Sequence, residues 1–352
     1  MQEKTDSNDG IRCLVWDLDN TLWSGTILEA DHCRLRPGVR LVLDELDRRG
    51  ILLSIASAND PDMALATLRR KGLAGYFLHQ QVGWNSKVRS IQEIADRLGI
   101  GLDTIGFIDD EPFEREQVRH LLPEVRTYPA KASRLLLELP EFKPLILTSE
   151  SRGRRHKYLQ AVEREAAAES SRMSRQEFLD YCRTTLTLRV AVPEDLTRIL
   201  ELMHRTHKLN STGVVYDEDE VAEWLSEGTR RVHVAQLADR FVDYGRIGVA
   251  VSCGESDSWE LTDFLMSCRV LARGITGYFL AWLVGEACSA GARRISCHYR
   301  PSGRNHRLDT LYKLAGFKLK EQYSDGSVLY EKRTQEAPPP PSWLTVEEVS
   351  EL

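Results

Sequence analysis

A buried apolar run that ends in two aspartates constrains this chain more than any other stretch. The residues from Cys13 to Trp16 are apolar, and Asp17 and Asp19 follow them with one residue between. Residues i and i+2 of an extended chain point to the same side, so both carboxylates would project from the end of one core strand. Two carboxylates so near to each other repel unless a cation or a shared proton lies between them. The pair therefore indicates a site, and the alternative is an aspartate-rich turn that merely ends a strand.

Strands and helices alternate through the rest of the first half. We expect buried strands at 13–16, 51–56, 76–82 and 104–108. Segments with helical apolar spacing, several of them ended by glycine, follow at 37–49, 61–71, 86–98 and 113–122. This order predicts a Rossmann-like α/β domain, a parallel sheet with helices on both faces. Ligands of such sheets bind beyond the carboxyl ends of the strands.

The polar residues that stand out in this half follow those strands directly, and they are Ser57, Asn59, Asp109 and Asp110, with Lys87 at a helix start. A carboxylate can take a phosphoryl group covalently, and a second one nearby can protonate the leaving oxygen and later activate water. Further carboxylates bind Mg²⁺, which prefers oxygen ligands. A hydroxyl, an amide and a lysine would orient the transferring group. The alternatives are a turn role for Ser57 and a solvated helix start for Lys87.

This ordered set resembles the haloacid dehalogenase-like phosphatase superfamily over about residues 11–145. The resemblance implies that Asp17 is the nucleophile and Asp19 the acid and base. It implies phosphate-binding roles for Ser57, Asn59 and Lys87. It also implies Mg²⁺ as the cofactor, with ligands among Asp17, Asp19, Asp109 and Asp110, and it leaves open which of the last two binds directly. A receiver-like phosphoacceptor domain is the alternative, but the order of the motifs favours the phosphatase.

Length and composition limit the class of protein. The 352 residues suffice for two domains of ordinary size. A net charge of -6 argues against a general nucleic-acid binder, and no apolar run approaches a membrane span. We therefore expect neither nucleic acid nor a membrane as partner. The first ten residues lack a secretory apolar segment, and the seven cysteines form no CxxC pair, which favours reduced thiols in a cytoplasmic protein.

A charged helical connector at 146–185 separates the first half from an expected α+β domain at 186–332. We expect strands in that domain at 186–192, 232–237, 247–253, 259–266 and 293–299. We expect helices at 193–206, 275–290 and 308–314. The proline-rich segment 333–352 that follows is expected to be a disordered tail.

Cys268 is the candidate nucleophile of the second half. It lies at the end of an expected strand, beside Arg269 and shortly before a helix begins. Cationic surroundings and a helix start favour the thiolate, which is the nucleophilic form. The alternative is a buried cysteine that acts as a small apolar residue. Arg269, Ala272 and Gly274 belong to a loop before that helix, where backbone N–H groups attract anions.

This loop and the segment 311–317 resemble the GNAT-type acyltransferase fold, which binds coenzyme A by such a loop. The whole of 11–332 resembles the FkbH-like family, glyceryltransferase/phosphatases of polyketide biosynthesis, through the motifs at 15–23, 107–115, 264–271 and 304–305. The resemblance implies that a phosphopantetheine arm is bound by Arg269, Ala272, Gly274, Arg304 and Asn305. The chain departs from the usual family residues at Glu111, His207, Lys208 and Ala272.

The family resemblance implies 1,3-bisphosphoglycerate as donor and an acyl carrier protein as acceptor. Cys268 would attack the acyl phosphate to form a glyceryl thioester, and Asp17 with Asp19 would remove the remaining phosphate. Two other classes stay open. A stand-alone magnesium-dependent small-molecule phosphatase would need only the first half. A carrier-protein binding module would need neither Asp17 nor Cys268.

Overall fold

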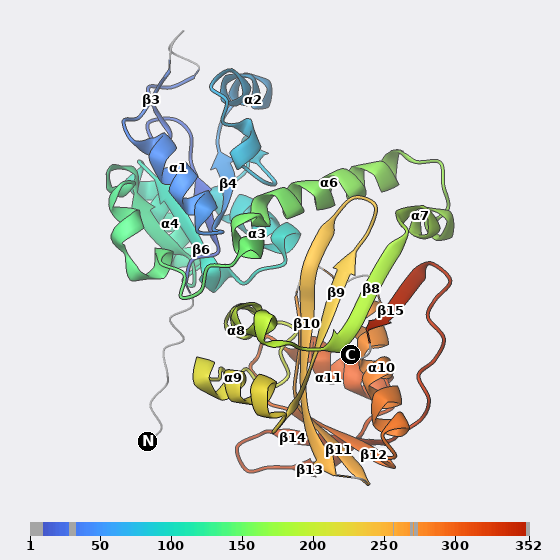
Figure 1. The fold of residues 1–352 in the computed structure, drawn as a ribbon. Helices are drawn as coiled ribbons and strands as arrows, with labels where there is room; N and C mark the ends of the chain where they lie inside the picture. The colour runs from blue at the N-terminus through green and yellow to red at the C-terminus, as the bar shows by residue number, and fades with distance from the viewer. Residues whose placement is uncertain (1–9, 28–32, 256, 268–269, 271–273, 350–352) are drawn as a thin grey trace. The chain divides into compact units, whose positions relative to one another are not determined.

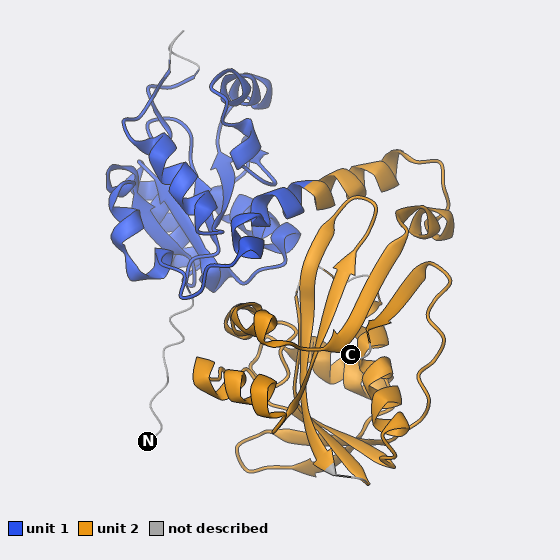
Figure 2. Ribbon diagram, in the orientation of Figure 1, with its two compact units in different colours: residues 1–159 blue, residues 160–352 orange. Residues whose placement is uncertain are grey.

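The structure is a computed structural model, and it describes residues 10–27, 33–255, 257–267, 270 and 274–349. The chain divides into two compact units, residues 1–159 and 160–352, which are coloured separately in Figure 2. Each unit has its own sheet and its own apolar core. Cys268, Arg269 and Ala272 lie outside the described residues.

The first unit is built on a five-stranded sheet in the order β5-β4-β1-β6-β7 (Figure 1). Every pair of neighbouring strands is parallel. The strands are β1 (Cys13–Trp16), β4 (Leu52–Ser57), β5 (Gln81–Val82), β6 (Ile105–Asp109) and β7 (Arg126–Pro129). A short antiparallel pair, β2 (Trp23–Ser24) and β3 (Arg34–Leu35), lies apart from this sheet.

Helices cover both faces of this sheet, and the central strand β1 is therefore buried on both sides. The helices are α1 (Val39–Arg48), α2 (Pro61–Arg70), α3 (Lys87–Leu98) and α4 (Pro112–Leu121). Leu14 and Trp16 of β1 belong to the cluster that contains the buried residues of α1 and α2. Cys13 and Val15, which point the other way, pack with those of α3 and α4. The predicted α/β class is confirmed.

The strand expected at 76–82 is shorter than predicted. Ala74–Tyr76 forms a 3-10 turn, Phe77 makes a single isolated bridge with Leu53 of β4, and Gln81–Val82 forms the strand that pairs with β4. His79 explains the difference, because its φ of 46° is left-handed and interrupts the extended backbone. The apolar run contained no glycine or proline that would have signalled this break.

Between the two sheets the chain is helical, with α5 (Ser149–Arg152), α6 (Arg154–Ser170) and α7 (Arg175–Cys182). The second unit has an eight-stranded, mainly antiparallel sheet in the order β13-β14-β12-β11-β10-β9-β8-β15. Its strands are β8 (Thr184–Val190), β9 (Arg231–Ala238), β10 (Asp243–Glu255), β11 (Ser258–Met266), β12 (Arg294–Tyr299), β13 (Lys318–Gln322), β14 (Val328–Arg333) and β15 (Leu344–Val349).

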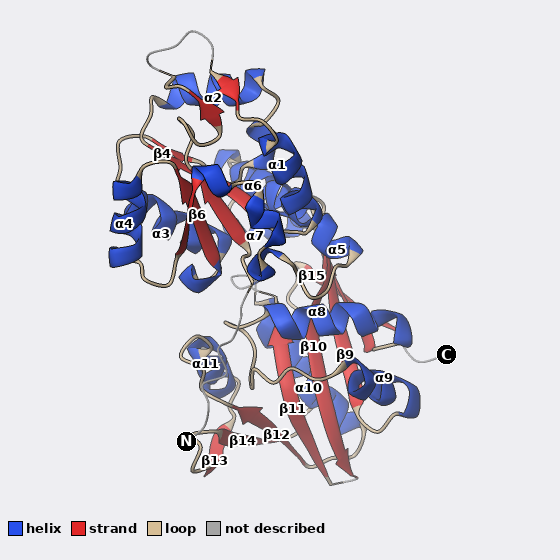
Figure 3. Cartoon of the chain, turned by 90° about the vertical axis from the view of Figure 1, so that its left-hand side faces the viewer, coloured by secondary structure: helices blue, strands red, loops and turns tan. Residues whose placement is uncertain are grey.

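Helices also cover both faces of the second sheet. Figures 1 and 3 show α8 (Leu196–Arg205) and α9 (Glu218–Glu227) on one face and α10 (Ile275–Ser289) on the other. α10 is apolar nearly all round, and Phe279, Leu280 and Leu283 are fully buried in the core. α11 (His306–Leu314) also contributes to this core. The predicted α+β class of this half is confirmed. No helix within the described residues is apolar over the length that a membrane crossing needs.

The C-terminal segment corrects the expectation of a disordered tail. Residues 344–349 form β15, which pairs in parallel with the edge strand β8. Leu344 enters the apolar core, and Glu348 accepts a hydrogen bond from the indole N–H of Trp282 at 2.9 Å. An uncovered edge strand leaves a row of unpaired backbone groups, and the tail satisfies those of β8. The sequence did not predict β15 because the proline run before this strand suggested disorder.

We predict that Leu344→Ala lowers the free energy of unfolding of the second unit by about 2–4 kcal/mol, because it removes a buried leucine from a packed core. Val349→Ala is the matched control on the same strand, where the side chain is 54% exposed. Urea unfolding followed by tryptophan fluorescence measures both. Equal, small effects of the two variants would mean that the tail does not pack on β8 in solution.

A buried histidine makes the second unit sensitive to acid. His233 on β9 has no exposed surface, and its ring lies 5.4 Å from that of Trp282 and 6.2 Å from that of Trp259. Neither ring nitrogen has a hydrogen-bond partner among the described residues. Burial, with a smaller contribution from the charge of Arg231, lowers the pKa of His233 to about 3. The folded protein therefore holds this ring neutral.

We predict that His233→Phe removes part of the acid sensitivity of the fold. The folded pKa lies below the unfolded value, so the stabilisation is present above about pH 6.5 and is lost as the pH falls and the unfolded chain takes up a proton. Between pH 7.5 and pH 5 this costs about 2 kcal/mol. Urea unfolding at both pH values measures the difference, with exposed His306→Gln as control. An unchanged difference in His233→Phe would refute this account.

Candidate active site

The carboxyl ends of β1, β4 and β6 meet at one edge of the first sheet, and three charged side chains lie together there. The Lys87 ammonium forms an ion pair with Asp17, and its Nζ lies 3.2 Å from Oδ2 of Asp109. The same group donates a hydrogen bond of 2.7 Å to the carbonyl of Ala56 at the end of β4. All three charged side chains are buried, with Lys87 only 4% exposed.

Burial and charge act against each other in this cluster. Burial raises the pKa of Asp17, although the Lys87 charge opposes the change. Burial and then the charge of Asp17 raise the pKa of Asp109 to about 6. Burial alone would lower the pKa of Lys87, but the two carboxylates outweigh it and the pKa is raised. Lys87 therefore stays cationic between two carboxylates whose charges would otherwise repel each other.

Local sequence explains how Lys87 reaches this position. Ser86 caps α3, since its hydroxyl accepts a hydrogen bond from the Arg89 N–H. Lys87 is consequently the first residue of the helix and faces inward, toward the ends of β1 and β6. Its Nζ also lies 5.7 Å from the centre of the Phe107 ring. A solvated helix start, the alternative interpretation of this lysine, does not match its burial.

Asp19 is held by three N–H donors. They are the indole N–H of Trp23 at 2.8 Å, the amide of Asn59 at 3.0 Å and the backbone N–H of Ile27 at 3.2 Å. Asn59 Nδ2 also lies 3.3 Å from the hydroxyl oxygen of Ser57. Asn59 therefore links the end of β4 to Asp19 and fixes the orientation of that carboxylate.

Thr21 is a site residue that sequence reasoning missed. Its hydroxyl donates to Oδ1 of Asp110 at 3.1 Å and accepts the backbone N–H of Asp110 at 2.9 Å. Arg115 holds the same turn by donating to the carbonyls of Asp109 and Asp110 at 2.8 Å each. Both residues were part of recognised motifs but had no assigned role. The available signal in the sequence was the place of Thr21 two residues after Asp19; its burial and the φ of 50° at Asn20 became visible only in the structure.

The site fits a magnesium ion. Carboxylate oxygens of Asp17, Asp109 and Asp110 lie within 4.8 Å of one another. Oδ2 of Asp109 is buried, and apart from its ion pair with Lys87 it has no hydrogen-bond partner within the described part of the chain. Such a set of hard oxygen donors is the kind that Mg²⁺ binds. The Asp19 carboxylate stands outside this cluster, because its donors are Trp23, Asn59 and Ile27.

The residues expected to bind a phosphopantetheine arm are described only in part. Gly274 has a φ of 73° and caps the start of α10, and Arg304 is exposed. Asn305 is buried, and its amide donates to the carbonyls of Asn210 and Arg300 at 2.9 and 2.8 Å. Its Oδ1 accepts from the Tyr299 hydroxyl and the Ser302 N–H. Asn305 therefore stabilises the loop that contains Asn210.

The loop that contains Asn210 takes the place of β12 as the neighbour of β11 along the last part of that strand. β11 pairs with β12 only as far as Leu261. Beyond that point, Ser211 donates its N–H to the carbonyl of Phe264, and Met266 donates to that of Leu209. The segment at 209–211 thus covers the free edge of β11 just before the region that contains Cys268.

No family model matches this chain, and no curated protein matches it. This chain is similar to the N-terminal part of the protein BF1531 from Bacteroides fragilis, which contains a phosphatase domain and was complexed with Mg. The identity is 26%, with 43% of this chain and 39% of that chain covered and a TM-score of 0.33. The chain thus spans well under half of that protein.

Two acetyltransferases are also similar to this chain. An acetyltransferase of the GNAT family from Streptococcus pneumoniae is 17% identical over 43% of this chain and 99% of its own, with a TM-score of 0.34. The ribosomal-protein-S18-alanine N-acetyltransferase from Escherichia coli is 17% identical over 44% of this chain and 96% of its own, with a TM-score of 0.34.

We predict that Thr21→Val weakens Mg²⁺ binding roughly tenfold or more, because residues that hold metal ligands contribute this much to metal affinity. Thr21→Ser keeps the hydroxyl and is the matched control, with affinity close to that of the natural protein. Isothermal titration calorimetry with Mg²⁺ measures the three proteins. Equal affinities of the valine and serine variants would contradict the role assigned to the hydroxyl.

Proposed function

We propose that this chain is a bifunctional glyceryltransferase and phosphatase. It would take 1,3-bisphosphoglycerate, remove its phosphate and load the glyceryl unit through a Cys268 thioester onto the phosphopantetheine of an acyl carrier protein. The observation that carries the phosphatase half is Lys87 between the buried carboxylates of Asp17 and Asp109, with Asp110 close by. The transfer half is supported by the sequence resemblance, since Cys268 lies outside the described residues.

In the phosphatase half, an oxygen of Asp17 attacks the phosphorus of the ester. The bond between phosphorus and the leaving oxygen breaks, and Asp19 supplies the proton that this oxygen takes up. Water then attacks the phosphoaspartate and loses its proton to Asp19, which releases phosphate and restores Asp17. The three donors to Asp19 keep its carboxylate oriented for both proton transfers.

Lys87 orients Asp17 and would neutralise charge on the transferring phosphoryl group. Asp17, Asp109 and Asp110 would hold Mg²⁺. When bound, the ion supplies Lewis acidity and neutralises phosphate charge. The exposed position of Asp110 leaves this side of the site open to an entering substrate.

In the transfer half, the Cys268 thiolate attacks C1 of 1,3-bisphosphoglycerate. The bond between C1 and the phosphate oxygen breaks, phosphate leaves, and a thioester remains on the enzyme. After Asp17 has removed the C3 phosphate, the thiolate of the carrier protein attacks the thioester carbonyl, the bond between this carbon and the Cys268 sulfur breaks, and Cys268 leaves as a thiolate. Each acyl transfer conserves the energy of the activated carbonyl.

We predict that Asp17→Asn and Cys268→Ala fail in different ways. The first keeps the thiol and should leave a phosphoglyceryl group on the enzyme or the carrier protein, because the C3 phosphate is not removed. The second should leave the carrier protein unloaded. Intact-mass spectrometry of enzyme and carrier protein after incubation with 1,3-bisphosphoglycerate and Mg²⁺ distinguishes these products.

Asp62→Asn, an exposed position on α2, is the control and should load glyceryl normally. Normal loading by Cys268→Ala would disprove the thioester. Normal phosphate release by Asp17→Asn would disprove the assigned nucleophile. Phosphate release without any loading by the natural chain would instead favour a stand-alone small-molecule phosphatase.

A further inference from the structure

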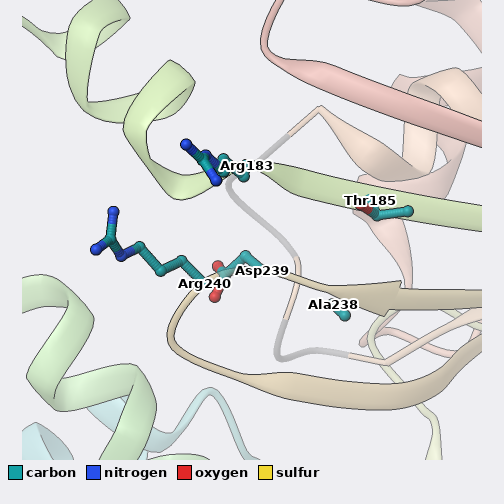
Figure 4. Close-up of a pocket in the computed structure, with 5 residues that line it drawn as sticks. All are labelled: Arg183, Thr185, Ala238, Asp239 and Arg240. Atoms are coloured by element: carbon teal, nitrogen blue, oxygen red, sulfur yellow. The ribbon is translucent and has the colours of Figure 1, made fainter.

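A cavity of about 540 Å³ that is open to solvent lies in the second unit, where α7 ends and the β9–β10 turn meets β8 (Figure 4). Its lining residues are Arg183, Thr185, Ala238, Asp239 and Arg240. None of these residues has a role in the function proposed above. Both arginine side chains extend to the same side of the turn in Figure 4.

The charge of this cavity is positive. Neither Arg183 nor Arg240 has a carboxylate oxygen within 4.0 Å among the described residues. Asp239, the acidic group of the lining, is already neutralised by Arg164, whose Nε lies 2.9 Å from its Oδ2. Its Oδ1 accepts the backbone N–H groups of Phe241 and Val242 at 2.9 Å each. Two guanidinium groups therefore remain available to an anion.

The backbone holds Arg183 in an unfavourable conformation. Arg183 is the C-cap of α7, and its φ of 49° lies in the left-handed region. Helices commonly end with glycine in this conformation, whereas a residue with a Cβ is disfavoured by about 1 kcal/mol. An arginine in a conformation that favours glycine is consistent with a use for its side chain.

Arg240 is held in place beside it. Its guanidinium lies over the Tyr181 ring, 4.3 Å from the centroid, and its backbone N–H donates to the Cys182 carbonyl at 2.8 Å. These contacts connect the β9–β10 turn to the end of α7. The backbone positions of Arg183 and Arg240 are therefore fixed relative to each other. A side chain fixed before binding loses less entropy when a ligand arrives.

We propose that this cavity binds the phosphate group of a small phosphorylated ligand. Guanidinium groups present planar pairs of N–H donors that match phosphate oxygens, and a phosphate monoester carries enough negative charge for two arginines. The Thr185 hydroxyl offers a further donor from β8. Unlike the site of the first unit, this one contains no free carboxylate and would bind phosphate without Mg²⁺.

Titration calorimetry of the full chain with inorganic phosphate, in a buffer with a metal chelator, tests the proposal. We expect binding of one phosphate per chain. A double variant, Arg183→Gly with Arg240→Gln, should bind roughly tenfold or more weakly, as expected for the loss of charge-assisted hydrogen bonds. Arg333→Gln, an exposed arginine on β14, should bind like the natural protein.

Thermal unfolding separates binding from a structural role of Arg183. Arg183→Gly relieves the left-handed arginine, so this variant should be at least as stable as the natural protein while it binds phosphate more weakly. The proposal is overturned if the natural chain binds no phosphate under these conditions or if the double variant binds equally well. Since these measurements need no turnover, their outcome does not depend on the phosphatase assignment.

Discussion

The ammonium group of Lys87, buried between Asp17 and Asp109, is the interaction on which the site of the first unit depends. Two carboxylates buried side by side would cost several kcal/mol without a cation, because each loses its hydration. Lys87 offsets this cost, and the Ser86 cap and the Ala56 carbonyl keep it in place. The sheet order brings the ends of β1, β4 and β6 together, so one lysine can serve all three strands.

The same arrangement would suit a bound phosphate group. Asp19, Asn59 and Ser57 form a hydrogen-bonded set on one side of Asp17. Thr21 and Asp110 form another on the side of β6. Asp17, the proposed nucleophile, thus has the proposed acid and base Asp19 on one side and the carboxylates that would hold Mg²⁺ with it on the other. Transfer of a phosphoryl group needs both a residue that moves a proton and ligands for a metal ion. The whole group of residues is therefore more informative than any single aspartate.

Much of this site could be predicted from the sequence because the carboxylates directly follow apolar strands and Lys87 begins a helix. The positions in the sequence single out Asp17, Asp109 and Lys87 as site candidates. The parallel sheet brings these residues together. Thr21 was not assigned, since its partner Asp110 lies 89 residues away and only the tertiary fold makes them neighbours. The fold classes followed from periodicity. The strand β15 did not, because its pairing partner β8 is 160 residues distant and the intervening proline run suggested disorder.

The most direct test of the phosphatase assignment is a rapid acid quench during turnover with a phosphate-ester substrate and Mg²⁺, followed by peptide mass spectrometry. Trypsin releases Asp17 and Asp19 in one peptide, residues 13–34, because arginines stand at 12 and 34. We predict that this peptide carries the mass of one phosphoryl group on Asp17 in the natural chain. Phosphate release without any phosphorylated peptide, or with the phosphoryl group on Asp19, would contradict the account.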